Sequence, residues 1–147
     1  MTLPDVNVWL ALALSGHPNH HLARRWLDGQ HHAESVFFCR ATEQSFLRLL
    51  TTPPVFKPFG IPPLSNQAAW DLFRQYCADD RIALAREPHG VSTSWKRWAL
   101  TDNASPKLWM DAWLAAVAHS AGFQLVTFDE AFTQFDGLKV RILGSPL

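Results

Sequence analysis

Four acidic residues, Asp5, Glu43, Asp111 and Asp129, stand where an α/β fold can gather them at one site. Glu43 interrupts a ridge of apolar side chains at helical spacing, and Asp111 does the same in a second helical segment. Asp5 and Asp129 each close a short apolar run that is typical of a strand. Carboxylates are rarely buried unless they are paired, so a shared cation is expected between them.

The donor atoms of such a cluster indicate which cation it would bind. All four side chains offer hard oxygen ligands, and no His or Cys accompanies them in these segments. Oxygen ligands suit Mg²⁺ or Mn²⁺ better than softer metals. The residue types therefore favour a divalent-metal site made of carboxylates.

Each of the four acids also has an ordinary structural explanation. Asp5 can end a strand or cap the helix that follows it, and Asp129 can cap a turn. Glu43 and Asp111 can complement the dipole in the first turn of a helix. Their joint occurrence favours the metal site, while the explanation of each single residue stays open.

Strands and helices that would carry these acids alternate along the chain. Apolar runs predict strands at 3–6, 35–39, 82–85, 124–127 and 139–143, and helical spacing predicts helices at 8–15, 21–28, 41–50, 66–78, 92–100 and 107–121. Pro106 and Gly122 suit the ends of the last helix, and a Ser or Thr cap is expected at the start of the helix before it. The proline-rich segment 51–65 is expected to be a long loop, and 130–135 a turn or short helix. This alternation predicts an α/β sandwich with a mostly parallel sheet, whose sites form at the carboxyl ends of the strands.

Length and composition bound the organisation of the protein. The 147 residues suggest a single domain over 1–147 with zero formal net charge, so any surface for nucleic acid must be a local patch. Cys39 and Cys77 are expected to be reduced thiols of a cytoplasmic protein, with one disulfide as the alternative. No apolar run is long enough to span a membrane, and the N-terminus lacks the basic start of a secretion signal.

The four acids lie in four segments that resemble, in order, the motifs of a known family. The segments are LPDVNVWLAL (3–12), RATEQSFLRLLT (40–51), WMDAWLAA (109–116) and LVTFDEAF (125–132). Together they resemble the VapC-type toxins, which are PIN-domain ribonucleases of toxin–antitoxin modules. The resemblance covers nearly the whole chain, although residues 86–107 match no part that we can place.

This resemblance implies a PIN-like α/β/α sandwich and a role for each motif residue. The catalytic and metal-binding residues would be Asp5, Glu43, Asp111 and Asp129. Asn7 and Thr127 would be supporting polar groups, and Arg40 would contact a phosphate or a partner. Mg²⁺ or Mn²⁺ would be the cofactor, and a metal-activated water would hydrolyse the phosphodiester.

Partners are implied by the same resemblance. The substrate would be RNA, cut by an endoribonuclease toxin of a type II module, and the toxin would form a homodimer. A cognate VapB-like antitoxin would lay its C-terminal segment across the active groove. The candidates to flank that groove are segment 51–65 and the basic residues Arg24, Arg25, Arg40 and Arg48.

Other interpretations compete with this one. The histidines between His17 and His32 suggest zinc, but cysteines at zinc spacing are absent. An aspartyl-phosphate domain would use Asp5, but it places a second acid where this chain has Asn7. A catalytically silent binding module of the same fold is separated only by a cleavage assay. Tryptophans at helical spacing between 95 and 113 fit a core or a dimer interface better than a base-stacking platform.

Overall fold

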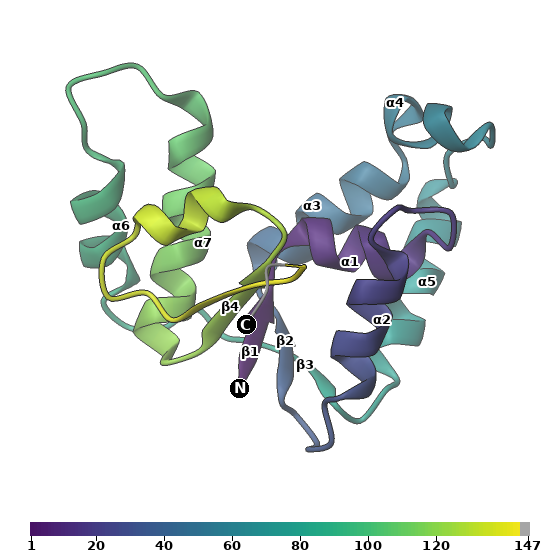
Figure 1. Ribbon diagram of the computed structural model, residues 1–147, viewed down its shortest axis with the longest axis horizontal. Helices are drawn as coiled ribbons and strands as arrows, with labels where there is room; N and C mark the ends of the chain where they lie inside the picture. The colour runs from purple at the N-terminus through teal and green to yellow at the C-terminus, as the bar shows by residue number, and fades with distance from the viewer. Residues whose placement is uncertain (145–147) are drawn as a thin grey trace.

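A five-stranded sheet forms the centre of the computed structural model, which describes residues 1–144 (Figure 1). Every pair of neighbouring strands is parallel, and the order is β3-β2-β1-β4-β5. The strands are β1 (Thr2–Pro4), β2 (Val36–Phe38), β3 (Ile82–Leu84), β4 (Gln124–Thr127) and β5 (Val140–Ile142). The predicted parallel sheet is therefore confirmed.

The strand order creates a switch point between β1 and β4. From β1 the chain proceeds to β2 and β3 on one side, and then crosses back to add β4 and β5 on the other side. In open parallel sheets such a point leaves a crevice at the carboxyl ends of the two central strands. Asp5 directly follows β1 and Asp129 follows β4, so both acids emerge at this crevice.

Pro4 determines how β1 pairs with its two neighbours. Thr2 donates its N–H to the carbonyl oxygen of Ser35 beside β2, whereas Asp5 donates to that of Val126 in β4. By this alternation the N–H that Pro4 lacks would face β2. Accordingly, β1 pairs with β4 at all three of its residues but with β2 only at Thr2. The β1–β2 ladder therefore stops before it reaches Asp5.

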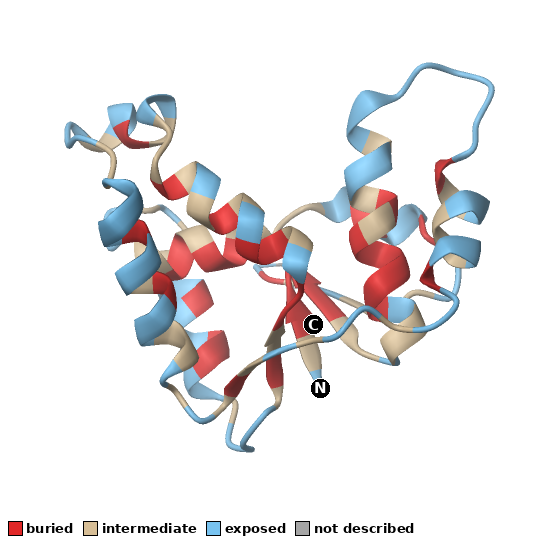
Figure 2. Cartoon of the chain, turned by 180° about the vertical axis from the view of Figure 1, so that it is seen from behind, coloured by how far each residue is buried: buried red, intermediate tan, exposed pale blue. Residues whose placement is uncertain are grey.

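Helices cover both faces of the sheet, as the two sides of Figure 1 show. One face carries α1 (Val6–Ala13), α2 (His20–Asp28), α3 (Arg40–Leu50) and α5 (Asn66–Cys77), and the other carries α6 (Val91–Ala99) and α7 (Pro106–Ala121). Side chains of a strand alternate between these two cores: Leu125 packs toward α7 and Val126 toward α1. Buried residues accordingly line the strands and the inner helix faces (Figure 2). This is the expected α/β/α sandwich.

Residues 86–107, which had no counterpart in the family motifs, contain α6 and lead into α7. The Trp95 ring packs edge-on against Trp109 and Trp113, with centroids 5.6 and 5.2 Å apart. Trp98 packs against Phe135 at 5.3 Å. These tryptophans fasten α6 to α7, which agrees with the expectation of a packing role.

Two expectations about helix boundaries are wrong. Segment 51–65 is not a loop throughout, because it holds α4 (Pro53–Phe56) and the 3₁₀ turn η1 (Lys57–Phe59). Pro53 stands in the first turn, where no N–H donor is required, and the buried Phe56 anchors the turn to the core. Helix α6 has no Ser or Thr cap, because its N-cap is Gly90 with a φ of 78°. The short helix expected after Asp129 is confirmed as η2 (Glu130–Gln134).

Both cysteines are free thiols, as expected. Cys39 is buried at the start of α3, and Cys77 is partly buried at the end of α5. The alternative of a disulfide between them is therefore wrong. Within residues 1–144, no helix combines the length and apolar character needed to cross a membrane.

We predict that Gly122→Ala lowers the free energy of unfolding by about 1 kcal/mol, because Gly122 ends α7 with a φ of 70° that costs an L side chain energy. A Cβ added there meets nothing within 4 Å, so the cost lies in the backbone alone. Gly29→Ala is the matched control, since Gly29 ends α2 with a φ of −80°. Urea unfolding monitored by circular dichroism measures both variants. Equal losses would contradict the backbone explanation.

Candidate active site

Asp5 connects β1 to α1 and is held by both of its carboxylate oxygens. One oxygen caps α1 by accepting the N–H of Val6 at 2.6 Å, and the other accepts the hydroxyl of Thr127 at 2.9 Å. Asp5 therefore does cap the helix that follows it, which was its ordinary structural explanation. Burial nevertheless raises the pKa of Asp5 to about 6, and the charges of Asp111 and Asp129 act in the same direction.

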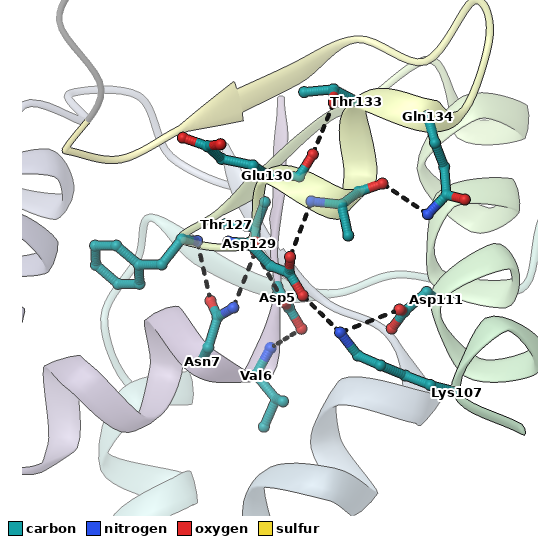
Figure 3. A network of polar contacts seen from close by, with 12 residues as sticks. Asp5, Val6, Asn7, Lys107, Asp111, Thr127, Asp129, Glu130, Thr133 and Gln134 are labelled. Atoms are coloured by element: carbon teal, nitrogen blue, oxygen red, sulfur yellow. Dashed lines mark hydrogen bonds and ion pairs between the residues drawn. The ribbon is translucent and has the colours of Figure 1, made fainter.

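Thr127 orients Asp5 from the end of β4. A hydroxyl has one proton and two lone pairs, and Thr127 engages all three. It donates to Asp5 and accepts from the Asn7 side-chain amide and the Asp129 backbone N–H, both at 3.0 Å (Figure 3). Asn7 in turn accepts the N–H of Phe128 at 3.4 Å. The structure thus places Asn7 and the fully buried Thr127 beside Asp5, where sequence reasoning expected supporting groups.

Lys107 joins the other two acids from the first turn of α7. Its Nζ lies 2.6 Å from Asp129 Oδ2 and 3.4 Å from Asp111 Oδ2. Burial raises the pKa of Asp111 and outweighs the attraction of Lys107, while the hydrogen bond from Lys107 lowers the pKa of Asp129. We call Asp5, Asp111, Asp129 and Lys107 the acid site. Sequence reasoning missed Lys107, whose only signal was its place four residues before Asp111.

Glu43 pairs with Arg40 on its own helix, α3, whereas Lys107 pairs with Asp111 and Asp129. The Glu43 carboxylate is buried and accepts a hydrogen bond from Arg40 at 2.7 Å, so each of these two predicted site residues is engaged with the other. After burial, the Glu43 charge also contributes to the raised pKa of Cys77 in α5. The structure therefore brings together three of the four acids. Within residues 1–144, no three acidic, His or Cys side chains converge closely enough to hold one ion as they stand.

A pocket of about 190 Å³ opens between α3 and α7 beside the acid site. Asp5 and Asp111 line it together with α3 residues that include Ser45 and Arg48. Arg48 is thus the basic residue that meets the expectation of a flanking arginine. Arg24 does not, because it pairs with Asp28 at 3.5 Å and lines a separate pocket between α2 and α5.

The acid site fits a divalent cation in its donor chemistry. All of its acidic ligands are carboxylate oxygens, which suit Mg²⁺ or Mn²⁺. An ammonium group already lies between two of them, at a position that a metal ion would share. Burial raises the pKa of Asp5 and the charges of Asp111 and Asp129 add to this, so a further positive charge beside Asp5 would favour its ionised form. Asp5, Asp111 and Asp129 are therefore the residues that would hold the metal.

The histidines have other partners in this structure. A ring nitrogen of His20 lies 2.7 Å from the carbonyl oxygen of Ala11, and a ring nitrogen of His17 accepts the N–H of Asn19 at 3.1 Å. Across the described part of the chain, no His or Cys group is arranged to bind a metal.

Comparison with known proteins places the chain in a family. The sequence matches the PIN domain over residues 2–138. It is 50% identical over 145 residues to Ribonuclease VapC41 of Mycobacterium tuberculosis, with 98% of this chain and 99% of that protein covered. The chain belongs to the VapC-type PIN-domain family. A second relative in this family, Ribonuclease VapC31 of the same species, is 31% identical over the full length of both chains.

Solved structures of VapC-type proteins share the fold. M. tuberculosis VapC20, described as a sarcin–ricin loop cleaving toxin, superposes with a TM-score of 0.64 at 18% identity, covering 96% of this chain and 99% of that one. VapBC-1 from nontypeable Haemophilus influenzae gives 0.62 at 15% identity, with 96% of both chains covered. The family resemblance and the expected fold are thus confirmed for this VapC-type chain.

We predict that the stability of the metal-free protein falls as pH rises through the window between the ordinary pKa of Asp5 near 4 and its raised value of about 6. In this window the folded state binds more protons than the unfolded state, so deprotonation favours unfolding. Relative to Asp5→Asn, the wild type should lose roughly 1 kcal/mol between pH 5 and pH 7.5.

Urea unfolding in excess chelator at both pH values measures this difference. Asp102→Asn, at an exposed loop position, is the control and should follow the wild type. The opposite result would be a wild type that gains stability relative to Asp5→Asn as pH rises over the same window. It would show that the folded protein stabilises Asp5 as a carboxylate.

Proposed function

We propose that the chain is the toxin of a type II toxin–antitoxin module and acts as an endoribonuclease that requires Mg²⁺ or Mn²⁺. One observation carries the proposal: Asp5, Asp111 and Asp129 meet at the switch point of a chain whose 50% identical relative is named a ribonuclease. The aligned region extends over nearly the whole of both proteins, so it spans all the segments that carry the acids.

The residues of the acid site would have different roles in binding the metal ion. Asp5, Asp111 and Asp129 would hold the ion, which when bound supplies Lewis-acid chemistry that makes water a better nucleophile and shields phosphodiester charge. Thr127 fixes the orientation of Asp5, so this ligand loses little freedom on binding. Glu43 joins the proposal as the fourth acid, and it must release Arg40 to do so.

The pocket between α3 and α7 is where RNA would lie. Arg48 stands in its lining on the α3 side, with its guanidinium available for a phosphate oxygen. Met110 and Leu114 provide an apolar wall on the α7 side. The pocket thus offers a charged contact for the backbone and an apolar surface for a base, next to the acids.

We predict that RNA is cleaved with Mg²⁺ or Mn²⁺ and left intact in excess chelator, because the proposed chemistry depends on a divalent cation held by carboxylates. Products should carry a 5′-phosphate and a 3′-hydroxyl, as the family resemblance implies, and no cyclic phosphate, because water rather than the ribose 2′-hydroxyl would attack phosphorus. Asp111→Asn should lower the rate roughly 100-fold or more. Gel assays on total RNA measure this, with the exposed-loop variant Asp102→Asn as control.

Robust cleavage in chelator, or a cyclic phosphate at the product end, would refute this chemistry. Binding of RNA without any cleavage would instead identify a silent binding module. Sequencing of RNA ends after brief expression in cells, against Asp5→Asn, then reveals the target and the position of the cut.

Two partners complete the proposal. A cognate VapB-like antitoxin would lay an acidic segment across the pocket between α3 and α7, where Arg48 and Lys107 supply positive charge. The structurally similar protein from H. influenzae is VapBC-1. A homodimer is proposed on the resemblance to VapC-type toxins, and a cytoplasmic location agrees with the two free thiols.

We predict that the antitoxin inhibits cleavage and that Arg48→Ala weakens its binding about tenfold, since a charged contact of roughly 1.4 kcal/mol is lost. Arg25→Ala is the matched control, because Arg25 is exposed on α2. Calorimetric titration of the toxin with its antitoxin measures both. An antitoxin that binds without reducing cleavage would contradict occlusion of the pocket.

A further inference from the structure

Lys107 occupies a position that helix stability does not explain. It is the second residue of α7, after Pro106, and the positive end of the helix dipole disfavours a cation there. It also precedes Asp111 by four residues, which is the weaker order for an ion pair along a helix. The carboxylates of the acid site, rather than the helix, therefore hold its ammonium group in place.

The oxygen atoms that Lys107 contacts are those that a metal ion would need. Asp129 uses Oδ1 to cap η2 through the N–H of Ala131, which leaves Oδ2 as its free oxygen. Lys107 Nζ takes that Oδ2 at 2.6 Å and Asp111 Oδ2 at 3.4 Å. Lys107 and a divalent cation therefore compete for the same pair of ligands.

Lys107 is also easily displaced. Its side chain is 70% exposed, so its ammonium group regains water with little rearrangement when it leaves. Ion pairs of such exposed lysines contribute little to stability. A divalent cation carries twice the charge of the ammonium group that now pairs with Asp111 and Asp129.

We propose that Lys107 is a built-in competitor of the metal: it pairs with Asp111 and Asp129 while the metal is absent, and it must leave these carboxylates before they bind a divalent cation. The proposal rests on the proposed metal dependence and adds that this lysine sets the metal affinity of the site. Once released, Lys107 remains beside the acids on a flexible stem, where a phosphate of the substrate is a suitable partner.

Titration of the full-length protein with MnCl₂ tests the competition directly, with binding followed by calorimetry and by the electron paramagnetic resonance of free Mn²⁺. Lys107→Gln should bind Mn²⁺ about three- to tenfold more tightly than the wild type, because the competing charge is gone. Lys107→Met should behave like Lys107→Gln, whereas Lys107→Arg should stay near the wild type. Lys96→Gln removes an exposed charge from neighbouring α6 and controls for net charge.

Thermal unfolding provides a second readout. In excess chelator, Lys107→Gln should melt below the wild type, since Asp111 and Asp129 then repel each other without a counter-ion. In saturating Mn²⁺ this difference should close or reverse. A purely structural lysine would instead lower the melting temperature under both conditions and leave Mn²⁺ affinity unchanged.

The outcomes separate this inference from the proposed function. Wild-type binding of Mn²⁺ that is lost in Asp111→Asn, together with unchanged or weaker binding in Lys107→Gln, would overturn the competition and leave metal dependence standing. Absence of Mn²⁺ binding in the wild type and in every Lys107 variant would overturn both. The competition is supported only if Lys107→Gln and Lys107→Met both bind Mn²⁺ more tightly than the wild type and Lys107→Arg does not.

Discussion

The pairing of β1 with β4 is the interaction on which the rest of the structure depends. It joins two strands from opposite ends of the sequence at the middle of the sheet, so the helices that follow each strand are brought to opposite faces. Two further bonds extend it past the strands, from the Asp5 N–H to Val126 and from Thr127 to the Asp5 carboxylate. Because Pro4 removes a donor on the β2 side, the strand pairing that reaches Asp5 comes from β4.

The same geometry gathers negative charge where water solvates it poorly. Asp5 is the clearest case, since two hydrogen bonds do not restore its ordinary pKa. Lys107 offsets part of the repulsion between the acids. The repulsion that remains disfavours the folded state, and proteins keep such unfavourable contacts mainly where a function needs them. The neighbouring elements tolerate this repulsion because Leu3, Leu125 and the small residues of α7 pack tightly behind the site.

The spacing of apolar residues along the sequence predicted the sheet and the long helices. It also predicted that Asp5 and Asp129 lie close together, because the carboxyl ends of parallel strands share one edge of the sheet. The same spacing predicted burial of Glu43 but not its partner, since helical spacing does not say which neighbour a buried face meets. Lys107 read as an ordinary surface lysine, because its two acids come together only in the folded chain. Helix α4 was not predicted because its prolines are typical of a loop, although proline also occurs in the first turn of a helix.

The Thr127–Asp5 hydrogen bond joins residues 122 positions apart, and this separation has a consequence during translation. Asp5 leaves the ribosome well before its partners on β4, which follow only after helices α1 to α7 have been made. Contacts of such long range form late, because the intervening chain must first be closed into a loop. A growing chain that lacks β4 therefore has α1, α3 and Asp5 but no assembled acid site. Under the proposed function, a chain able to cut RNA therefore exists only after β4 has been made and paired with β1.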